Sequence, residues 1–204
     1  MQMNTMKQRG RIRERLIRIL LNEPNGTLTM YRISKEAKCS FPWVHEFLRK
    51  LEAKTLVNKT RVKDYTGLLK YWLEVKTHAD KEEYMHKDPL NLLKRTRLQY
   101  ALTTYQAENL VQQYLFPSRI DLYIMKTDTE QWHELLTKEG LVGKGNVRLL
   151  TTDDHVFYGS FQREGLNIVS LPQLIVDLFE EGGVCITAAE KLLEKVAKDS
   201  VRTN

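Results

Sequence analysis

The stretch that decides the fold is SFPWVHEFLRKLEAKTLV, residues 40–57. Its apolar residues recur at i, i+3, i+4 and i+7, the spacing of one buried helical face. They are Val44, Phe47, Leu48 and Leu51. We expect Ser40 to cap this helix, with Pro42 in the first turn, where a proline costs no hydrogen bond. The opposite face is polar, so the helix has one side for a core and one for solvent or a ligand.

Two further helices are predicted before this one. An apolar repeat at helical spacing predicts a helix from Arg11 to about Asn22. Thr29 is expected to cap a second helix that runs to about Lys38, and a tight turn separates it from the third. Leu28, just before Thr29, is a candidate for a short strand.

A two-stranded hairpin is predicted after the third helix. The first strand carries cations at alternating positions, so their side chains point to one side of the strand. These cations are Lys59, Arg61 and Lys63. Residues 64–67 are expected to form the turn, with Tyr65 at its tip, and Leu68–Trp72 to return as the second strand.

The order of three helices and a hairpin resembles the winged helix-turn-helix family. The third helix and the "Leu-Glu-x-x-x-Leu-Val" that follows it carry the resemblance, although Thr55 stands where the family usually has glycine. We therefore expect a less sharply turned helix end there. In this family the third helix enters the major groove of DNA, and the hairpin grips the phosphate backbone or a minor groove.

The candidate DNA-contacting residues lie on the third helix and on the hairpin. Arg49 is expected to bind a guanine and Glu46 a cytosine amine. The alternative for this face is a solvated polar surface, with Trp43 packed against the second helix. The helix candidates are Ser40, Phe41, Pro42, Trp43, His45, Glu46, Arg49 and Lys50, and the hairpin candidates are Lys59, Arg61, Lys63 and Tyr65.

Positive charge is concentrated at one end of the 204-residue chain. Residues 1–76 hold 17 Lys+Arg and 7 Asp+Glu, a net charge of +10, whereas residues 77–204 hold 15 and 19, a net charge of −4. A basic segment of this kind is typical of nucleic-acid binding. The basic start, Met1–Arg15, is either an arm on the DNA backbone or a solvated end. Two cysteines, Cys39 and Cys185, favour a reducing cytoplasm over a disulfide framework.

The remaining chain predicts a second domain of mixed secondary structure. Residues 77–97 are polar and are expected to be a partly helical linker between domains 1–76 and 98–204. In the second domain, predicted strands alternate with predicted helices. The strands are residues 100–103, 120–125, 146–150, 156–158 and 166–169. One helix is expected around residues 107–114, and three more begin near residues 127, 170 and 187 at capping boxes. The whole chain is therefore predicted to be α+β.

The order of motifs in this second domain resembles the C-terminal domain of AbiEi-type antitoxins. The motifs are YALTTYQA (100–107), DLYI (121–124), GNVRLL (145–150), DHVF (154–157), VSLPQLIVDL (169–178), the glycines 182–183 and AAEKLL (188–193). The match covers most of residues 98–195, with Thr104 where the family more often has glycine. The resemblance implies a prokaryotic, nucleoid-associated, autorepressing protein whose C-terminal domain can neutralise a nucleotidyltransferase-like toxin.

No set of residues predicts an active site. Asp153, Asp154 and His155 gather carboxylates and an imidazole, but a turn between strands uses the same residues for local hydrogen bonds. Asp64 and Glu74 fit a nuclease pattern only superficially. We expect neither a metal nor a cofactor, and no enzyme activity. A DNA-targeted nuclease or nucleotidyltransferase is the alternative.

The sequence therefore predicts a transcriptional regulator that binds double-stranded DNA at a specific sequence. We expect a homodimer, because one module reads too few base pairs to be selective. The C-terminal domain is expected to mediate self-association or to bind a partner protein. No membrane segment is expected, and the expected location is the cytoplasm.

Overall fold

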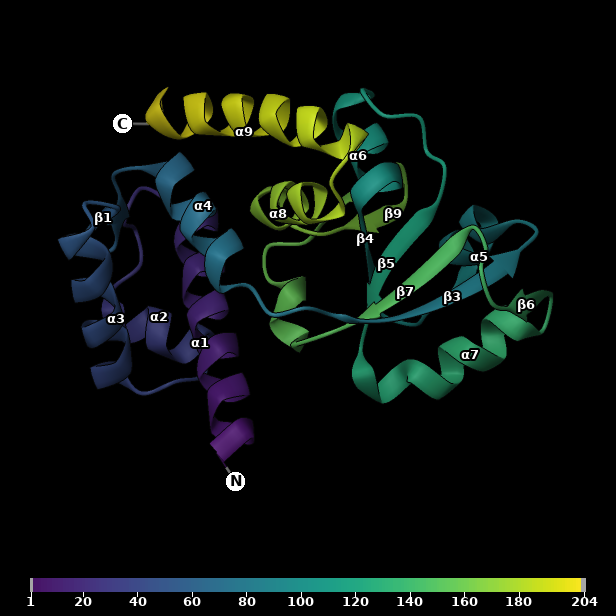
Figure 1. Cartoon of the computed structure of the whole chain (residues 1–204), viewed down its shortest axis with the longest axis horizontal. Helices are drawn as coiled ribbons and strands as arrows, with labels where there is room; N and C mark the ends of the chain where they lie inside the picture. Colours follow the sequence, from purple (N-terminus) through teal and green to yellow (C-terminus); the bar gives the residue numbers. More distant parts are fainter. Residues whose placement is uncertain (1, 203–204) are drawn as a thin grey trace. The chain divides into compact units, whose positions relative to one another are not determined.

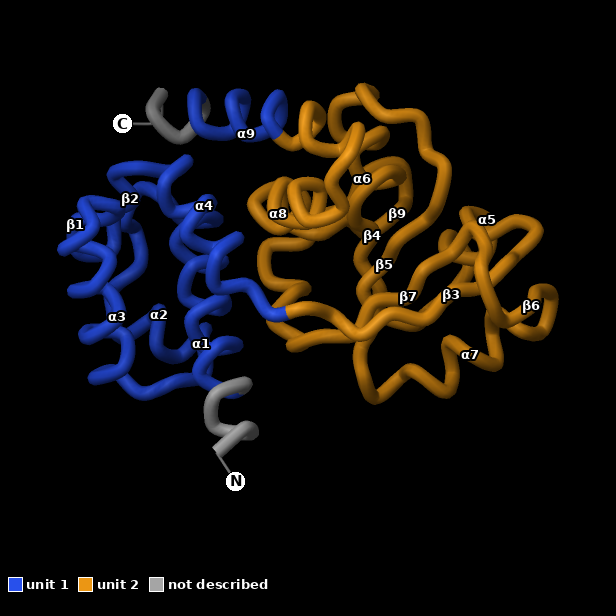
Figure 2. The backbone as a smooth tube through the Cα atoms, viewed as in Figure 1, with its two compact units in different colours: residues 1–77, 190–204 blue, residues 78–189 orange. Residues whose placement is uncertain are grey.

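The structure is a computed structural model that describes the backbone of residues 2–202 and the side chains of residues 8–198. The chain divides into two compact units (Figure 2). Unit 1 comprises residues 1–77 with 190–204, and unit 2 comprises residues 78–189. Residues 190–204 were expected in the C-terminal domain but group with unit 1, and the boundary between the units falls within the continuous helix α9 (Val184–Arg202) (Figure 1).

Unit 1 begins with α1 (Gln2–Asn22), which is longer than the sequence predicts. Its backbone is helical through residues 2–15 of the basic start. The helix packs against α4 (Tyr65–Val75). Buried Glu14 accepts hydrogen bonds from Trp72 Nε1 (3.2 Å) and from the Thr77 backbone (2.8 Å), while the Arg18 guanidinium lies over the Trp72 ring. These contacts join α1 to the C-terminal end of α4 and to Thr77 just after it.

The predicted helices and turn around residues 29–53 are confirmed. Thr29 caps α2 (Met30–Glu36), since its side chain accepts a hydrogen bond from the Arg32 backbone. Lys38 adopts a left-handed φ of 51° and turns the chain into α3 (Phe41–Ala53). The buried residues of α3 are the four predicted ones, Val44, Phe47, Leu48 and Leu51. Ser40 occupies the N-cap position of α3 but makes no side-chain capping bond.

Helix α3 ends sharply, contrary to the expectation based on Thr55. Thr55 has a φ of 60°, and the amides of Thr55 and Leu56 donate to the carbonyls of Glu52 (2.8 Å) and Leu51 (3.0 Å). This pair of hydrogen bonds defines a Schellman motif, which usually places glycine at the left-handed position. Threonine therefore forms the motif at a conformational cost.

We expect Thr55→Gly to raise the free energy of unfolding of unit 1 by roughly 0.5–1 kcal/mol. A left-handed L-residue costs about 1–2 kcal/mol, of which the added chain entropy of glycine offsets about half. Urea unfolding of the two proteins measures the difference. The control is Ala53→Gly, two residues earlier and helical, which should lower stability instead. Equal destabilisation by both substitutions would contradict the argument.

A short hairpin follows α3. Strands β1 (Val57–Asn58) and β2 (Arg61–Val62) pair antiparallel, with Val57 opposite Val62. A third segment joins them, since Asn25 bridges to Arg61 and the Val62 amide donates to the Pro24 carbonyl (2.9 Å). The short strand predicted at Leu28 is wrong, because the paired residue is Asn25.

The second hairpin strand predicted at Leu68–Trp72 is also wrong, because these residues lie in α4. The Asp64 side chain caps this helix by accepting from the Gly67 amide (2.7 Å). Leu68, Leu69 and Trp72 are fully buried in unit 1. The return strand is instead β2, only two residues after β1.

Unit 2 contains a seven-stranded mixed sheet, which confirms the α+β class. The strand order across the sheet is β6-β3-β7-β5-β4-β9-β8 (Figure 1). Neighbouring strands are antiparallel except for the pairs β7–β5 and β4–β9, which are parallel. The strands are β3 (Asp80–His86), β4 (Tyr100–Thr103), β5 (Ile120–Ile124), β6 (Gly140–Val142), β7 (Val147–Thr151), β8 (Phe161–Arg163) and β9 (Leu166–Ile168).

The linker predicted over residues 77–97 is wrong. Residues 80–86 form β3, which pairs with both β6 and β7, and α5 (Pro89–Arg95) follows. The strand was hidden by its polar residues: Tyr84 and His86 are buried, whereas the positions between and before them are mostly exposed charges. Hydrophobicity alone could not identify a strand of this kind.

The helices of unit 2 cover the sheet and tie it together. Helix α6 (Thr104–Gln112) packs on β4, β5 and α8 (Leu171–Glu181), and α7 (Thr129–Thr137) lies beside β3 and β6 (Figure 1). The strand predicted at residues 156–158 is wrong, since a 3₁₀ turn (Asp154–Phe157) lies there. The capping box predicted at Thr127 is wrong, because α7 begins at Thr129, and Ser170 occupies the N-cap position of α8 without a capping bond from its own side chain. The last predicted helix begins three residues earlier than expected, at Val184.

Candidate nucleic-acid interface

The outward face of α3 carries most of the predicted contact residues. Val44 and Phe47 point into the core of unit 1, so the residues between them point outward. The exposed side chains are Ser40, Phe41, Pro42, His45, Glu46, Arg49 and Lys50, and Trp43 is half-buried with its ring 5.8 Å from that of Phe47. This ring contact joins two residues of α3 that lie one helical turn apart.

Two of these charged residues bind each other. Lys50 Nζ lies 2.6 Å from Glu46 Oε1, a pair one helical turn apart. The hydrogen bond from Lys50 and the attraction of its charge lower the pKa of Glu46. Arg49 makes no hydrogen bond or ion pair with any side chain among residues 8–198. Arg49 is therefore the cation of this face whose donors are open to a ligand.

The hairpin adds cations next to α3. Lys59, Arg61 and Lys63 are exposed, as the sequence predicts, although Lys59 lies in the turn rather than in a strand. The Lys59 amide donates to Glu52 Oε1 (2.6 Å), which ties the turn to the last helical turn of α3. The helix face and the hairpin cations are thus held as one surface within unit 1.

Tyr65 does not belong to this surface. We expected it at an exposed hairpin tip, but it is the first residue of α4 and is only 7% exposed. Burial raises the pKa of its hydroxyl, which has no hydrogen-bond partner among the described residues. The correction follows from the Asp64 cap, which turns the chain into a helix before Tyr65 can reach the surface.

Helix α1 contributes two arginines that the sequence interpretation missed. Arg9 and Arg13, one turn apart, line a groove of about 530 Å³ in unit 1. The other lining residues are Trp43, Glu46, Phe47 and Lys50 of α3 and Tyr71 of α4. The sequence gives the i, i+4 spacing of these arginines within the basic start. That spacing predicts a groove only when α1 is known to lie beside α3.

Unit 2 holds a buried polar cluster. Arg119 and Arg148 each bind both Asp121 and Glu181, with distances from 2.6 to 3.1 Å. Thr104, whose φ is 48°, donates a short hydrogen bond to Asp121. This bond ties the first residue of α6 to strand β5.

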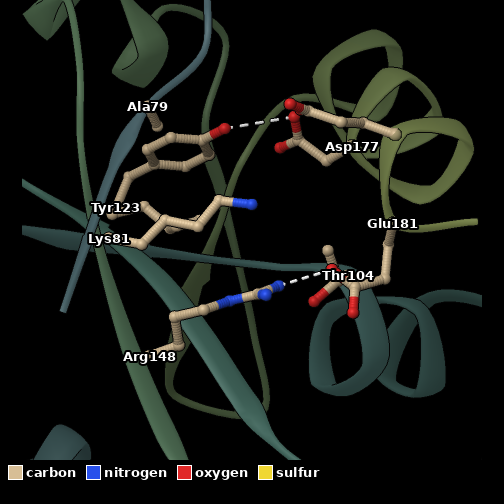
Figure 3. Close-up of a pocket in the computed structure, with 9 residues that line it drawn as sticks. Ala79, Lys81, Thr104, Tyr123, Arg148, Asp177 and Glu181 are labelled. Atoms are coloured by element: carbon tan, nitrogen blue, oxygen red, sulfur yellow. Dashed lines mark hydrogen bonds and ion pairs between the residues drawn. The ribbon is translucent and has the colours of Figure 1, made fainter. Parts of the chain in front are cut away.

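A second acidic centre lies beside the first. Asp177 of α8 accepts hydrogen bonds from Thr103, Tyr123 and Gln173. In Figure 3, Lys81 and Arg148 extend from the sheet toward Asp177 and Glu181. The cavity between these residues measures about 20 Å³, the space of a single water molecule. The cluster thus joins α8 to the sheet.

Two of the acids considered as catalytic candidates, and two histidines of unit 2, have structural partners. Asp153 accepts from the His155 amide (3.0 Å), and Asp64 caps α4. His78 binds Glu180, while His86 is buried and accepts from the Asp88 amide. Within the described part of the chain, no group of three or more His, Cys, Asp or Glu residues could hold a metal ion.

No protein-family model, curated protein or solved structure matches the chain. The similarity to winged helices and to AbiEi-type antitoxins consequently stays a prediction from the motifs. A search of the described helices for a stretch that is long and apolar enough to cross a membrane finds none.

Proposed function

We propose that unit 1 is a winged helix-turn-helix module that binds double-stranded DNA at a specific sequence. Helix α3 acts as the recognition helix in the major groove, and the hairpin acts as the wing on the phosphate backbone. The short third segment at Pro24–Asn25 is consistent with the small sheet from which such a wing extends.

One observation supports the proposal above all. The outward face of α3 and the cationic hairpin turn are joined by the Glu52–Lys59 hydrogen bond, so Arg49 and the hairpin cations face a ligand as one rigid surface. A duplex needs both elements, because bases are read by a helix in the groove while phosphates are held beside it. The net charge of +10 on residues 1–76 favours a polyanion as that ligand.

We further propose that the protein is a transcriptional regulator acting by occupancy of a promoter, in the manner of an autorepressing AbiEi-type antitoxin. A homodimer would read two half-sites related by its symmetry. Unit 2 would mediate this self-association or bind a partner such as a nucleotidyltransferase-like toxin. We propose the cytoplasm, on the nucleoid of a prokaryotic cell, as the location.

Selection of bound sequences from a random duplex pool tests the proposal. We expect enrichment of one motif, arranged as an inverted repeat if the protein binds as a dimer. Recovery of sequences indistinguishable from the starting pool would contradict sequence-specific binding. The selection is then repeated with the full chain carrying Arg49→Ala. A comparison of the two selected motifs identifies the base that Arg49 of α3 contacts.

We expect Arg49→Ala to relax the preference at one base pair by about 1–3 kcal/mol, because the substitution removes a bidentate arginine–guanine pair. Competition binding with single-base variants of the selected site measures this. The matched control is Arg163→Ala, an exposed arginine on β8 of unit 2, which should leave the preference unchanged. A uniform fall in affinity on every sequence would assign Arg49 to the backbone instead.

A further inference from the structure

The groove between α1, α3 and α4 has a composition that a DNA backbone does not require. Three aromatic side chains line it: Trp43, Phe47 and Tyr71. In a DNA duplex the bases are stacked in the interior of the double helix. A protein that contacts the DNA backbone would therefore use the cations of this groove and not its aromatic side chains. Its volume of about 530 Å³ lies within the range of about 300–1,000 Å³ typical of small-molecule sites.

The aromatic side of the groove is held in place. Trp43 and Phe47 lie with ring centroids 5.8 Å apart and ring planes tilted by 33°. Lys54 Nζ lies 5.7 Å from the centre of the Tyr71 ring, a cation–π contact. Phe47 is buried in the core, whereas Trp43 and Tyr71 are half-exposed and can each present a ring to a ligand.

The two arginines of the groove have no ion-pair partner among the described residues, although the charge of Arg9 acts on Glu46 and helps to lower its pKa. Neither Arg9 nor Arg13 forms a hydrogen bond or ion pair with a side chain among residues 8–198. The groove contains one carboxylate, Glu46, which is neutralised by Lys50 at 2.6 Å. Two arginines one turn apart can hold a phosphate or carboxylate by several charge-assisted hydrogen bonds.

We propose that this groove binds a small planar anion, an aromatic ring that carries a phosphate group, such as a mononucleotide. The ring stacks against Trp43 and Tyr71, and the phosphate binds Arg9 and Arg13. Stacking on aromatic side chains and pairing with arginine are the two interactions that such a ligand offers. Each half of the ligand therefore has its own half of the groove.

Occupancy of the groove would also control DNA binding, a consequence that rests on the proposed function. Trp43, Glu46 and Lys50 line the groove and also belong to the outward face of α3. A ligand in the groove would cover part of the surface that a duplex needs and would add negative charge beside it. The ligand is thus expected to compete with DNA.

Tryptophan fluorescence of the full chain tests the site without DNA. Trp72 and Trp132 are fully buried, so quenching by a stacked ring reports on Trp43. We expect adenosine monophosphate to quench the fluorescence saturably and adenosine to bind at least tenfold more weakly. Inorganic phosphate, measured by its displacement of the nucleotide, should also bind at least tenfold more weakly. If adenosine bound as tightly as the nucleotide, the arginines would not contribute to binding. If phosphate bound as tightly as the nucleotide, the aromatic rings would not contribute. An absence of quenching at millimolar nucleotide would overturn the proposal.

Arginine variants give the matched comparison. Arg13→Ala should weaken nucleotide binding at least tenfold, whereas Arg11→Ala, on the same helix but outside the groove, should leave it unchanged. Both variants should melt at the same temperature, so that weaker binding does not reflect unfolding. Equal effects of the two substitutions would overturn the assignment.

The DNA consequence has a separate readout. With the selected duplex, nucleotide should raise the apparent Kd in proportion to its occupancy of the groove. If nucleotide quenches Trp43 but no duplex binds, the groove site holds and the proposed DNA function fails. If a duplex binds and nucleotide does not, the groove proposal fails alone.

Discussion

Asp121→Ala is expected to lower the free energy of unfolding of unit 2 by about 3–5 kcal/mol, since it leaves buried charges without their partner. Asp121 is fully buried and accepts hydrogen bonds from Arg119, Arg148 and Thr104. Removing its carboxylate leaves two guanidinium groups that share only Glu181. The substitution also opens a space in the centre of the sheet.

The electrostatics of the cluster explain why Asp121 is expected to contribute strongly to the stability of unit 2. Desolvation raises the pKa of Glu181, but hydrogen bonds from Arg148 and Arg119 outweigh it and hold that pKa below its usual range. Without Asp121, a single carboxylate faces two arginines in a poorly hydrated site. Asp121→Asn keeps the shape and one acceptor, so we expect a smaller decrease in stability than for alanine.

Hydrogen exchange of the β5 amides, which lie in the middle of the sheet, measures the stability of unit 2 directly. The control is Asp80→Ala on β3, an exposed carboxylate of the same sheet, with an expected effect within about 0.5 kcal/mol. A decrease for Asp121→Ala no larger than that of the control would show that the cluster contributes little to stability.

The parts of the fold that local pattern determines could be predicted from the sequence. The buried face of α3 and the cap at Thr29 depend on residues within one or two helical turns, and both are confirmed. The α+β class follows from the alternation of segments. Strand β3 could not be predicted, because its pairing with β6 and β7 compensates for a polar composition that has no periodic signal.

The hairpin illustrates a conflict between two local signals. Leu68–Trp72 has apolar residues suited to either a strand or a helix, and the preceding Asp64 suits either a turn or a cap. The contact of α4 with α1 decides for the helix, since Glu14 and Trp72 are 58 residues apart in the chain and meet only after folding. Tyr65 consequently moves from a predicted contact residue to the core.

Some residues of the candidate site could be predicted from the sequence and others could not. The exposed residues of α3 and the hairpin cations could be predicted from spacing, because each lies within one element. The groove at Arg9 and Arg13 requires three elements to pack, and the Asp121 cluster joins residues from β5, β7 and α8. Such constellations have no signature in a single segment.

Substituting Lys59, Arg61 and Lys63 together by alanine is expected to reduce the dependence of DNA affinity on salt. Each phosphate contact that the substitutions remove lowers the slope of log affinity against log salt by about 0.9, hence by about 2.7 for three such contacts. Since the lines for the two proteins converge at high salt, the affinity at ~0.1 M salt should fall by roughly two to three orders of magnitude. Titrations at several salt concentrations measure both quantities.

The matched control removes the same charge from unit 2. Lys87, Lys94 and Arg97 are exposed there, and their joint substitution by alanine changes the net charge equally. If the hairpin cations contact phosphates, only their removal changes the slope, because a slope counts the counterions released at the contact and does not depend on net charge at a distance. Equal slopes for the two triple variants would exclude the hairpin from the interface, while Arg49 on α3 could still contact the duplex.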